Sequence, residues 1–253
     1  MIVAVIGLGT FGAKTAVRLF EKGAEVIAID KDGALVEKIK DRVTHAVTMD
    51  VTDESAVAAA FSDAAVEFGG IDILVSNAGI ASSAPIEETS LALWNKNMDI
   101  LSTGYFLVSR EAFKVFRVQD IGGSVVFIAS KNGLAASPNA AAYCTAKASE
   151  LHLARCLALE GAEAGIRVNV VNPDAVLRGS RIWEGEWLDQ RASTYGTDKD
   201  GLEEMYRQRS MLKRSVFPED IAEAAYFFAS DRSAKSTGNI VNVDAGNVQA
   251  FTR

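Results

Sequence analysis

The chain has little cysteine, histidine or proline, and each shortage narrows what the protein can be. Two cysteines, two histidines and four prolines occur in 253 residues. Neither Cys144 nor Cys156 stands at a metal-ligand spacing, so we expect no zinc site, no other metal site and no disulfide framework. Such thiols are typical of a reducing compartment, and a cytoplasmic location is therefore expected.

Positive charge and long apolar runs are also scarce. The 26 lysines and arginines are outnumbered by 33 aspartates and glutamates, which gives a net charge of −7. Nucleic acids and anionic membranes attract basic surfaces, so neither is expected as a partner. No stretch reaches the roughly 20 consecutive apolar residues that a membrane-spanning helix needs.

Short runs rich in valine and isoleucine alternate along the chain with longer segments of helical period. The expected strands are 2–6, 25–29, 46–48, 71–76, 124–129, 167–171 and 240–243. The expected helices are 12–22, 31–41, 54–68, 89–116, 142–164 and 219–230. Apolar strands alternating with helices are typical of a parallel sheet covered on both faces. We therefore predict an α/β protein, a single domain (1–253) built on a doubly wound, seven-stranded Rossmann sheet.

One segment, 178–216, breaks this alternation between the last two expected strands. It is rich in tryptophan, tyrosine and charged residues. An insertion at the carboxyl end of such a sheet is placed to cover a substrate, and that is the role we predict for it.

A glycine motif, GLGTFG, follows the first expected strand and opens the first expected helix. Gly7 permits the tight turn, Gly9 lets a pyrophosphate approach the backbone, and Gly12 lets helix and strand pack closely. Thr10 and Phe11 complete this loop, and the free N–H groups of the helix start attract phosphate. The motif predicts a dinucleotide site.

Two acidic positions extend this predicted site. Asp30 ends the second expected strand, 18 residues beyond Gly12. Its carboxylate should accept hydrogen bonds from the adenosine ribose and repel a 2′-phosphate, which favours NAD over NADP. Asp50 and Val51, after the third strand, either border the adenine or begin the next helix as an N-cap.

Three polar residues form a second motif, with Ser130 13 residues before Tyr143 and Lys147 four residues after it. Residues four apart share a helix face, so Lys147 should lie near Tyr143 and lower its pKa from about 10. Tyr143 could then exchange a proton with a substrate hydroxyl while Ser130 holds the same oxygen. We also expect Lys147 to bind the nicotinamide ribose, the cofactor carrying the hydride.

The text around this motif resembles the short-chain dehydrogenase/reductase family from about residue 50 onward. The matching stretches include FGGIDILVSNAG (68–79), SVVFIAS (124–130), AAYCTAKA (141–148) and GIRVNVVNP (165–173). The resemblance implies that Ser130, Tyr143 and Lys147 are the catalytic groups. It also implies cofactor contacts from Asn77, Ala78, Gly79, Pro173 and Val176.

Three positions depart from the family pattern. Leu101 stands where the family usually has an asparagine that holds a water near the lysine, and Asn97, one turn earlier, is a candidate substitute. Asp174 replaces a glycine, and Arg178 replaces a threonine that meets the nicotinamide. Asp174 and Arg178 either form a structural ion pair, or Arg178 or Lys131 holds an anionic substrate or product.

A subgroup resemblance bears on the substrate. DILSTGYF (99–106), the segment 130–147 and NPDAVLRGSRIW (172–183) resemble the dehydrogenase part of bifunctional rhamnulose-phosphate aldolase/lactaldehyde dehydrogenase proteins. This implies that a small hydroxy-aldehyde such as lactaldehyde is oxidised with NAD. Trp183 either lines the substrate pocket or packs the cover onto the sheet.

The first 50 residues carry a different resemblance. Family members space the three glycines at 0, 4 and 6, whereas here they stand at 0, 2 and 5. Residues 1–50 resemble the RCK-type nucleotide-sensing domains that regulate potassium transport. We therefore expect a recombined or engineered chimera joined near residues 46–53; a divergent dehydrogenase with an unusual phosphate loop is the alternative.

These observations favour an NAD-dependent dehydrogenase acting on a small molecule. A chimera that binds NAD(H) or adenine nucleotide with little turnover and a regulatory nucleotide sensor are the alternatives. The long expected helices 103–116 and 142–164 resemble those through which family members associate. A homo-dimer or homo-tetramer is therefore expected.

Overall fold

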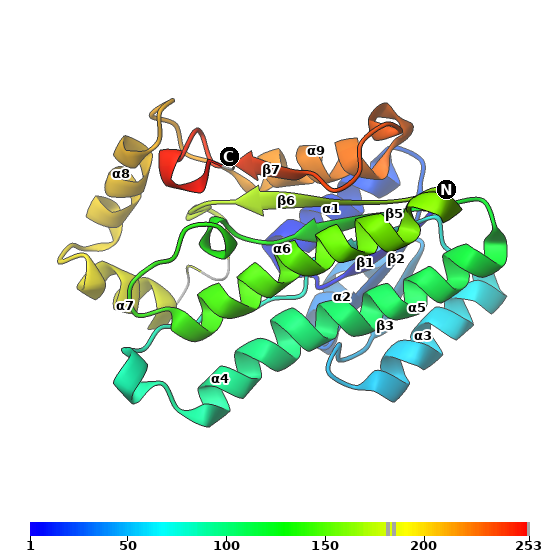
Figure 1. Cartoon of the computed structure of the whole chain (residues 1–253), viewed down its shortest axis with the longest axis horizontal. Helices are drawn as coiled ribbons and strands as arrows, with labels where there is room; N and C mark the ends of the chain where they lie inside the picture. The colour runs from blue at the N-terminus through cyan, green and yellow to red at the C-terminus, as the bar shows by residue number, and fades with distance from the viewer. Residues whose placement is uncertain (181–182, 184–185, 252–253) are drawn as a thin grey trace.

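A single parallel sheet organises the chain in its computed structural model, which describes residues 1–180, 183 and 186–251 (Figure 1). Within this described part the strand order is β3-β2-β1-β4-β5-β6-β7. The strands are β1 (Ile2–Ile6), β2 (Glu25–Asp30), β3 (His45–Thr48), β4 (Ile73–Ser76), β5 (Gly123–Ile128), β6 (Ile166–Pro173) and β7 (Ile240–Val243). The order reverses direction between β1 and β4, which is the doubly wound topology. The predicted fold class is confirmed.

Helices cover both faces of the sheet, with α3, α5 and α6 on one side and α1, α2 and α9 on the other (Figure 1). The helices are α1 (Thr10–Glu21), α2 (Gly33–Ile39), α3 (Glu54–Phe68), α4 (Leu91–Asn97), α5 (Gly104–Gln119), α6 (Ala141–Gly161), α7 (Glu186–Thr194), α8 (Lys199–Arg209) and α9 (Pro218–Ala229). Alternate side chains of β1 enter the two cores: Ala4 and Ile6 pack on the α3, α5 and α6 side, Val3 and Val5 on the other. This period of two explains why the strand is apolar at every position.

A π-helical turn, Met98–Thr103, joins α4 to α5, so a helical path continues from Leu91 to Gln119. A π turn adds a residue to the repeat and redirects the side chains around it. Leu101 is fully buried in the core here, and Ile100 borders the cavity described below. The sequence indicated one helix over 89–116 without this widened turn.

The segment 178–216 contains two helices that the sequence did not reveal, α7 and α8. They lie beyond the carboxyl ends of the strands, at the left of Figure 1. Leu188, Ala192 and Leu202 form a small core between them. The described residues of segment 178–216, called the cover below, therefore fold over the strand ends.

The first 50 residues share both cores with the rest of the chain. β1 pairs on one side with β2 and on the other with β4, in the register Val3 to Ile73. The side-chain amide of Asn77 donates to the Gly7 carbonyl at 2.8 Å and ties the turn after β4 to the glycine loop. Within the described residues, no helix has the length and apolar character that crossing a bilayer requires.

Candidate active site

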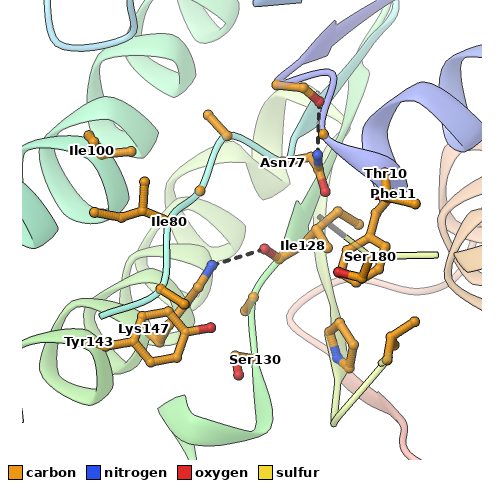
Figure 2. Close-up of a pocket in the computed structure, with 18 of the residues that line it drawn as sticks. Thr10, Phe11, Asn77, Ile80, Ile100, Ile128, Ser130, Tyr143, Lys147 and Ser180 are labelled. Atoms are coloured by element: carbon orange, nitrogen blue, oxygen red, sulfur yellow. Dashed lines mark hydrogen bonds between the residues drawn. The ribbon is translucent and has the colours of Figure 1, made fainter. Parts of the chain in front are cut away.

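A cavity of about 610 Å³ runs along the carboxyl ends of the strands, from the glycine loop to the cover. Its lining includes all but two of the residues that the sequence predicted to act in catalysis or to bind cofactor or substrate. These are Gly7, Gly9, Thr10, Phe11, Asp30, Asp50, Val51, Asn77, Ala78, Gly79, Ser130, Lys131, Tyr143, Lys147, Pro173, Val176 and Trp183. Gly12 and Arg178 lie outside the lining. One cavity thus joins both sequence motifs (Figure 2).

The three glycines of the loop differ in what surrounds them. Gly7 has a φ of +92°, and a Cβ there would lie 2.4 Å from the Ala78 nitrogen. A Cβ on Gly12 would lie 1.8 Å from the Gly7 carbonyl oxygen, so Gly12 serves close packing. A Cβ on Gly9 would meet nothing within 4 Å, although Gly9 borders the cavity. Open space beside the start of α1 fits a pyrophosphate.

Asp30 is fixed at the edge of this loop by backbone amides. Its carboxylate accepts from the Leu8 nitrogen at 2.5 Å and from the Asp32 nitrogen at 2.9 Å. The side chain therefore connects the end of β2 to the glycine loop after β1. That is where the sequence reasoning located the adenosine ribose.

Asp50 forms a tight turn of its own at the end of β3. Its carboxylate accepts from the Thr52 nitrogen and hydroxyl at 3.0 and 2.9 Å. Burial alone would raise the pKa of Asp50, but the Thr52 hydrogen bonds and the charge of Lys31 outweigh it and lower that pKa. Asp53, and not Asp50, caps helix α3 by accepting from the Ala56 nitrogen. Of the two roles considered for Asp50, the helix N-cap is therefore wrong.

Ser130 and Tyr143 face the cavity from the end of β5 and the first turn of α6 (Figure 2). The Ser130 hydroxyl oxygen accepts from the Asn132 nitrogen at 3.2 Å, which leaves its proton to donate. Burial raises the pKa of Tyr143 above its ordinary value; the Ser130 hydroxyl opposes this rise and the Glu150 charge adds to it. The expected lowering of this pKa by Lys147 is wrong, because burial raises the pKa and Lys147 lies against a counter-ion.

That counter-ion is Glu150, which the sequence reasoning missed. Lys147 Nζ lies 2.9 and 3.0 Å from the two Glu150 carboxylate oxygens, and it also donates to the Ile128 carbonyl at 3.3 Å (Figure 2). Glu150 is fully buried, and its burial raises its pKa to about 8 against the opposing charge of Lys147. A carboxylate three residues after the lysine was the available signal, since such residues share a helix face.

Asn97 does not take over the place of the family's asparagine. It is fully buried, and its side-chain amide donates to the Leu93 carbonyl and the Ser82 hydroxyl, each at 2.8 Å. Among the hydrogen bonds of the described residues, those of Lys147 go to Ile128 and Glu150 instead. The proposed substitution by Asn97 is therefore wrong.

The predicted pair of Asp174 and Arg178 is also wrong. Asp174 lies 2.6 Å from an Arg209 nitrogen, while Arg178 lies 2.7 Å from a Glu203 oxygen. Both new partners come from α8, whose fold the sequence did not reveal. The Arg178 side chain is 68% exposed, outside the cavity, whereas Lys131 borders the cavity and is buried.

A family model described as enoyl-(acyl carrier protein) reductase matches residues 8–247. The chain belongs to the short-chain dehydrogenase/reductase family. The match includes the glycine loop from Leu8 onward, Ser130, Tyr143 and Lys147, and nicotinamide cofactors are general in this family.

The relatives of this chain include proteins named as dehydrogenases and one that is named as inactive. The uncharacterized oxidoreductase YuxG of Bacillus subtilis is 51% identical over 98% of this chain, which spans 37% of that protein's length. The inactive 2-(S)-hydroxypropyl-CoM dehydrogenase 2 of Xanthobacter autotrophicus is 38% identical over 92% of this chain and 98% of its own. Sorbitol-6-phosphate 2-dehydrogenase of Erwinia amylovora has a similar structure, with a TM-score of 0.91, 32% identity and coverage of 98% and 99%.

These matches give no support to a chimera. The family match crosses residues 46–53 without a break. The alignment with the Bacillus relative covers 98% of this chain, so it includes most of the first 50 residues. An RCK-type origin of residues 1–50 and an engineered joint are therefore corrected to a single family lineage. The unusual glycine spacing is a local variation, since its loop packs closely on the turn at Ala78.

Proposed function

We propose that this chain is an NAD-dependent dehydrogenase that oxidises a small hydroxy-aldehyde, such as lactaldehyde, or a related alcohol. The observation that carries the proposal is the single cavity that joins the glycine loop to Ser130, Tyr143 and Lys147. The cavity volume, about 610 Å³, is typical of sites for cofactors and small ligands.

The glycine-loop end of the cavity suits the nucleotide half of NAD. Gly9 and the start of α1 would hold the pyrophosphate, and Asp30 the adenosine ribose. The fixed negative charge of Asp30 disfavours a 2′-phosphate, so NAD is proposed rather than NADP. Asp50 and Val51 would border the adenine.

The other end suits the nicotinamide half. The turn Asn77–Ala78–Gly79 and the residues Pro173 and Val176 border the space between the two motifs. Lys147 would hold the nicotinamide ribose. When bound, NAD supplies the acceptor for the hydride that leaves the substrate carbon.

Tyr143 would act as the acid/base. In the oxidative direction its phenolate takes the proton of the substrate hydroxyl, and the C–H electron pair leaves with the hydride, which creates the carbonyl. Ser130 donates a hydrogen bond to the same substrate oxygen and so fixes it beside Tyr143. Trp187, whose ring centroid lies 6.0 Å from that of Tyr143, would limit the substrate to a small molecule.

Two measurements test this function. Fluorescence titration with NADH and NADPH reports cofactor binding, and absorbance at the NADH band reports turnover of lactaldehyde, propanediol and other small alcohols. We expect NADH to bind and one of these substrates to be turned over. NADH binding with no turnover of any small alcohol or hydroxy-aldehyde would contradict the proposal.

We also propose that α5 and α6, adjacent in Figure 1, form the contact of a homo-dimer or homo-tetramer. Phe106 on α5 is 46% exposed and Leu159 on α6 is 81% exposed, and exposed apolar side chains favour association. Light scattering after size-exclusion chromatography should give a mass of two or four chains. A mass of one chain would contradict this assembly.

A further inference from the structure

Two buried cations border the cover end of the cavity, and neither has a carboxylate partner among the described residues. Arg191, on α7, is 1% exposed, and Lys131, in the turn after β5, is 4% exposed. Both line the cavity. Arginine and lysine are rarely buried without a counter-ion, because the desolvation of the charge is unfavourable.

Neutral groups hold the Arg191 guanidinium in place. It donates to the Pro138 carbonyl at 2.9 Å and to the Tyr195 hydroxyl at 2.8 Å. Its central carbon lies 5.4 Å from the Trp187 ring centroid and 4.9 Å from that of Tyr195. These contacts orient the guanidinium, but both acceptors are neutral, and a guanidinium has five N–H donors. Its positive charge therefore has no anionic partner among the described residues.

Lys131 has neutral partners as well. Its ammonium donates to the Ala135 carbonyl at 3.3 Å and the Ser137 hydroxyl at 3.2 Å. Burial lowers the pKa of Lys131, Asp174 raises it, and the charges of Arg209 and Arg191 lower it further. Arg191 is therefore near enough to Lys131 for the two charges to repel each other.

One carboxylate near Lys131, that of Asp174, compensates these charges only in part. Asp174 also lines the cavity, but it lies 2.6 Å from Arg209, its own cation, and accepts from Asn247. A further donor is unsatisfied: the buried indole N–H of Trp187 has no acceptor among the described residues. This end of the cavity thus combines excess positive charge with an unused hydrogen-bond donor.

We propose that Arg191 and Lys131 form a subsite for an anionic group of the substrate, a carboxylate or a phosphate. The Trp187 ring contacts both Tyr143 and the Arg191 guanidinium, which places the anionic group on the side of the reacting carbon that faces the cover. The planar guanidinium suits both anions, since it can donate two parallel hydrogen bonds to either. This inference rests on the proposed function, because it specifies the substrate of the same site.

Calorimetric titration with three small ligands tests the subsite. The ligands are 1,2-propanediol, which is neutral, lactate, which has a carboxylate, and glycerol 3-phosphate. Saturating NADH is present, so that a phosphate does not enter the pyrophosphate loop and no alcohol is oxidised during the titration. The variants are Arg191→Gln and Lys131→Met, and the matched control is Arg178→Gln, an exposed arginine of the same cover.

We expect one of the two anions to bind the wild type more tightly than propanediol. Arg191→Gln and Lys131→Met should each weaken that anion by about tenfold or more, with propanediol unchanged, as expected for the loss of a charge-assisted hydrogen bond. Arg178→Gln should leave all three dissociation constants unchanged. Which anion responds identifies the group as carboxylate or phosphate.

Two results would overturn the subsite: anions that bind the wild type no better than propanediol, or anion affinities that both variants leave unchanged. Thermal melting shows whether each variant folds. If Arg191→Gln does not fold, the affinities of Lys131→Met alone decide whether the subsite exists. Failure of the proposed function gives a different result, namely no NAD binding or no turnover. Titrations of wild type and variants with lactate and propanediol, repeated without cofactor, then still test the subsite.

Discussion

Glu150 should control the pH dependence of the reaction through its charge. Its carboxylate is buried on the same helix as Tyr143, bound to Lys147, and its charge raises the pKa of the tyrosine. Glu150→Gln removes that charge but keeps an oxygen that can accept from Lys147. The pKa of Tyr143 should therefore fall, and its phenolate should form at lower pH.

The size of the effect follows from the helix geometry. Glu150 follows Tyr143 by seven positions, which corresponds to about 10 Å along an α-helix. A unit charge at that distance contributes about 1.7 kcal/mol at an effective dielectric constant of about 20. This corresponds to a pKa lower by about one. Because the pKa of Glu150 is about 8, its charge is present mainly above that pH, and the profiles should diverge there.

The assay is the rate of substrate oxidation from pH 6 to 11 with saturating NAD. Oxidation needs the phenolate, so the rate should rise with pH throughout this range. Above pH 8, Glu150→Gln should reach any given fraction of the wild-type rate at pH 11 about one pH unit lower than the wild type does. Glu160→Gln, the same change at an exposed position of α6, is the control. Superimposable profiles, or a Glu150→Gln profile moved to higher pH, would refute the reasoning.

Three further predictions concern cofactor and core. Gly9→Ala should fold but bind NADH at least tenfold more weakly, because its methyl group occupies open space in the cavity. Gly12→Ala should bind NADH more weakly and also have a lower melting temperature, because its methyl group clashes with the loop. Equal melting temperatures for Gly12→Ala and the wild type would contradict this. Asp30→Asn should reduce the preference for NADH over NADPH in fluorescence titrations, and an unchanged preference would exclude its assigned role. Leu101→Ala should lower the free energy of urea unfolding by about 2–5 kcal/mol, since Leu101 is fully buried; a loss below about 1 kcal/mol would contradict its core role.

Much of the fold could be predicted because both cores impose local patterns on the sequence. β1 and β7 begin and end where their apolar runs do, and α3 spans the predicted 54–68. The glycine loop could also be predicted from the sequence, since it needs particular backbone conformations at fixed spacing. The positions of these elements depend mainly on residues that are close to one another in the sequence.

The remaining features depend on contacts between distant segments. Asp174 is paired by Arg209, 35 residues away, and no spacing rule indicates that partner. Arg191 contacts Pro138, which is distant in the sequence, and the Tyr195 ring of the cover. The sequence alone therefore did not distinguish it from an exposed arginine on a helix. The glycine spacing misled in another way. Two glycines at unusual offsets, together with the resemblance of residues 1–50, suggested a second lineage, although the loop packs closely on the turn after β4.

The most direct test of the account is Tyr143→Phe, measured for both NADH binding and turnover. The variant loses only a hydroxyl, so NADH should bind as it does in the wild type. Turnover should fall by about 10²–10⁴-fold, the usual contribution of a positioned acid/base. Turnover that survives in Tyr143→Phe within a factor of about three would contradict the central claim that this tyrosine carries the proton.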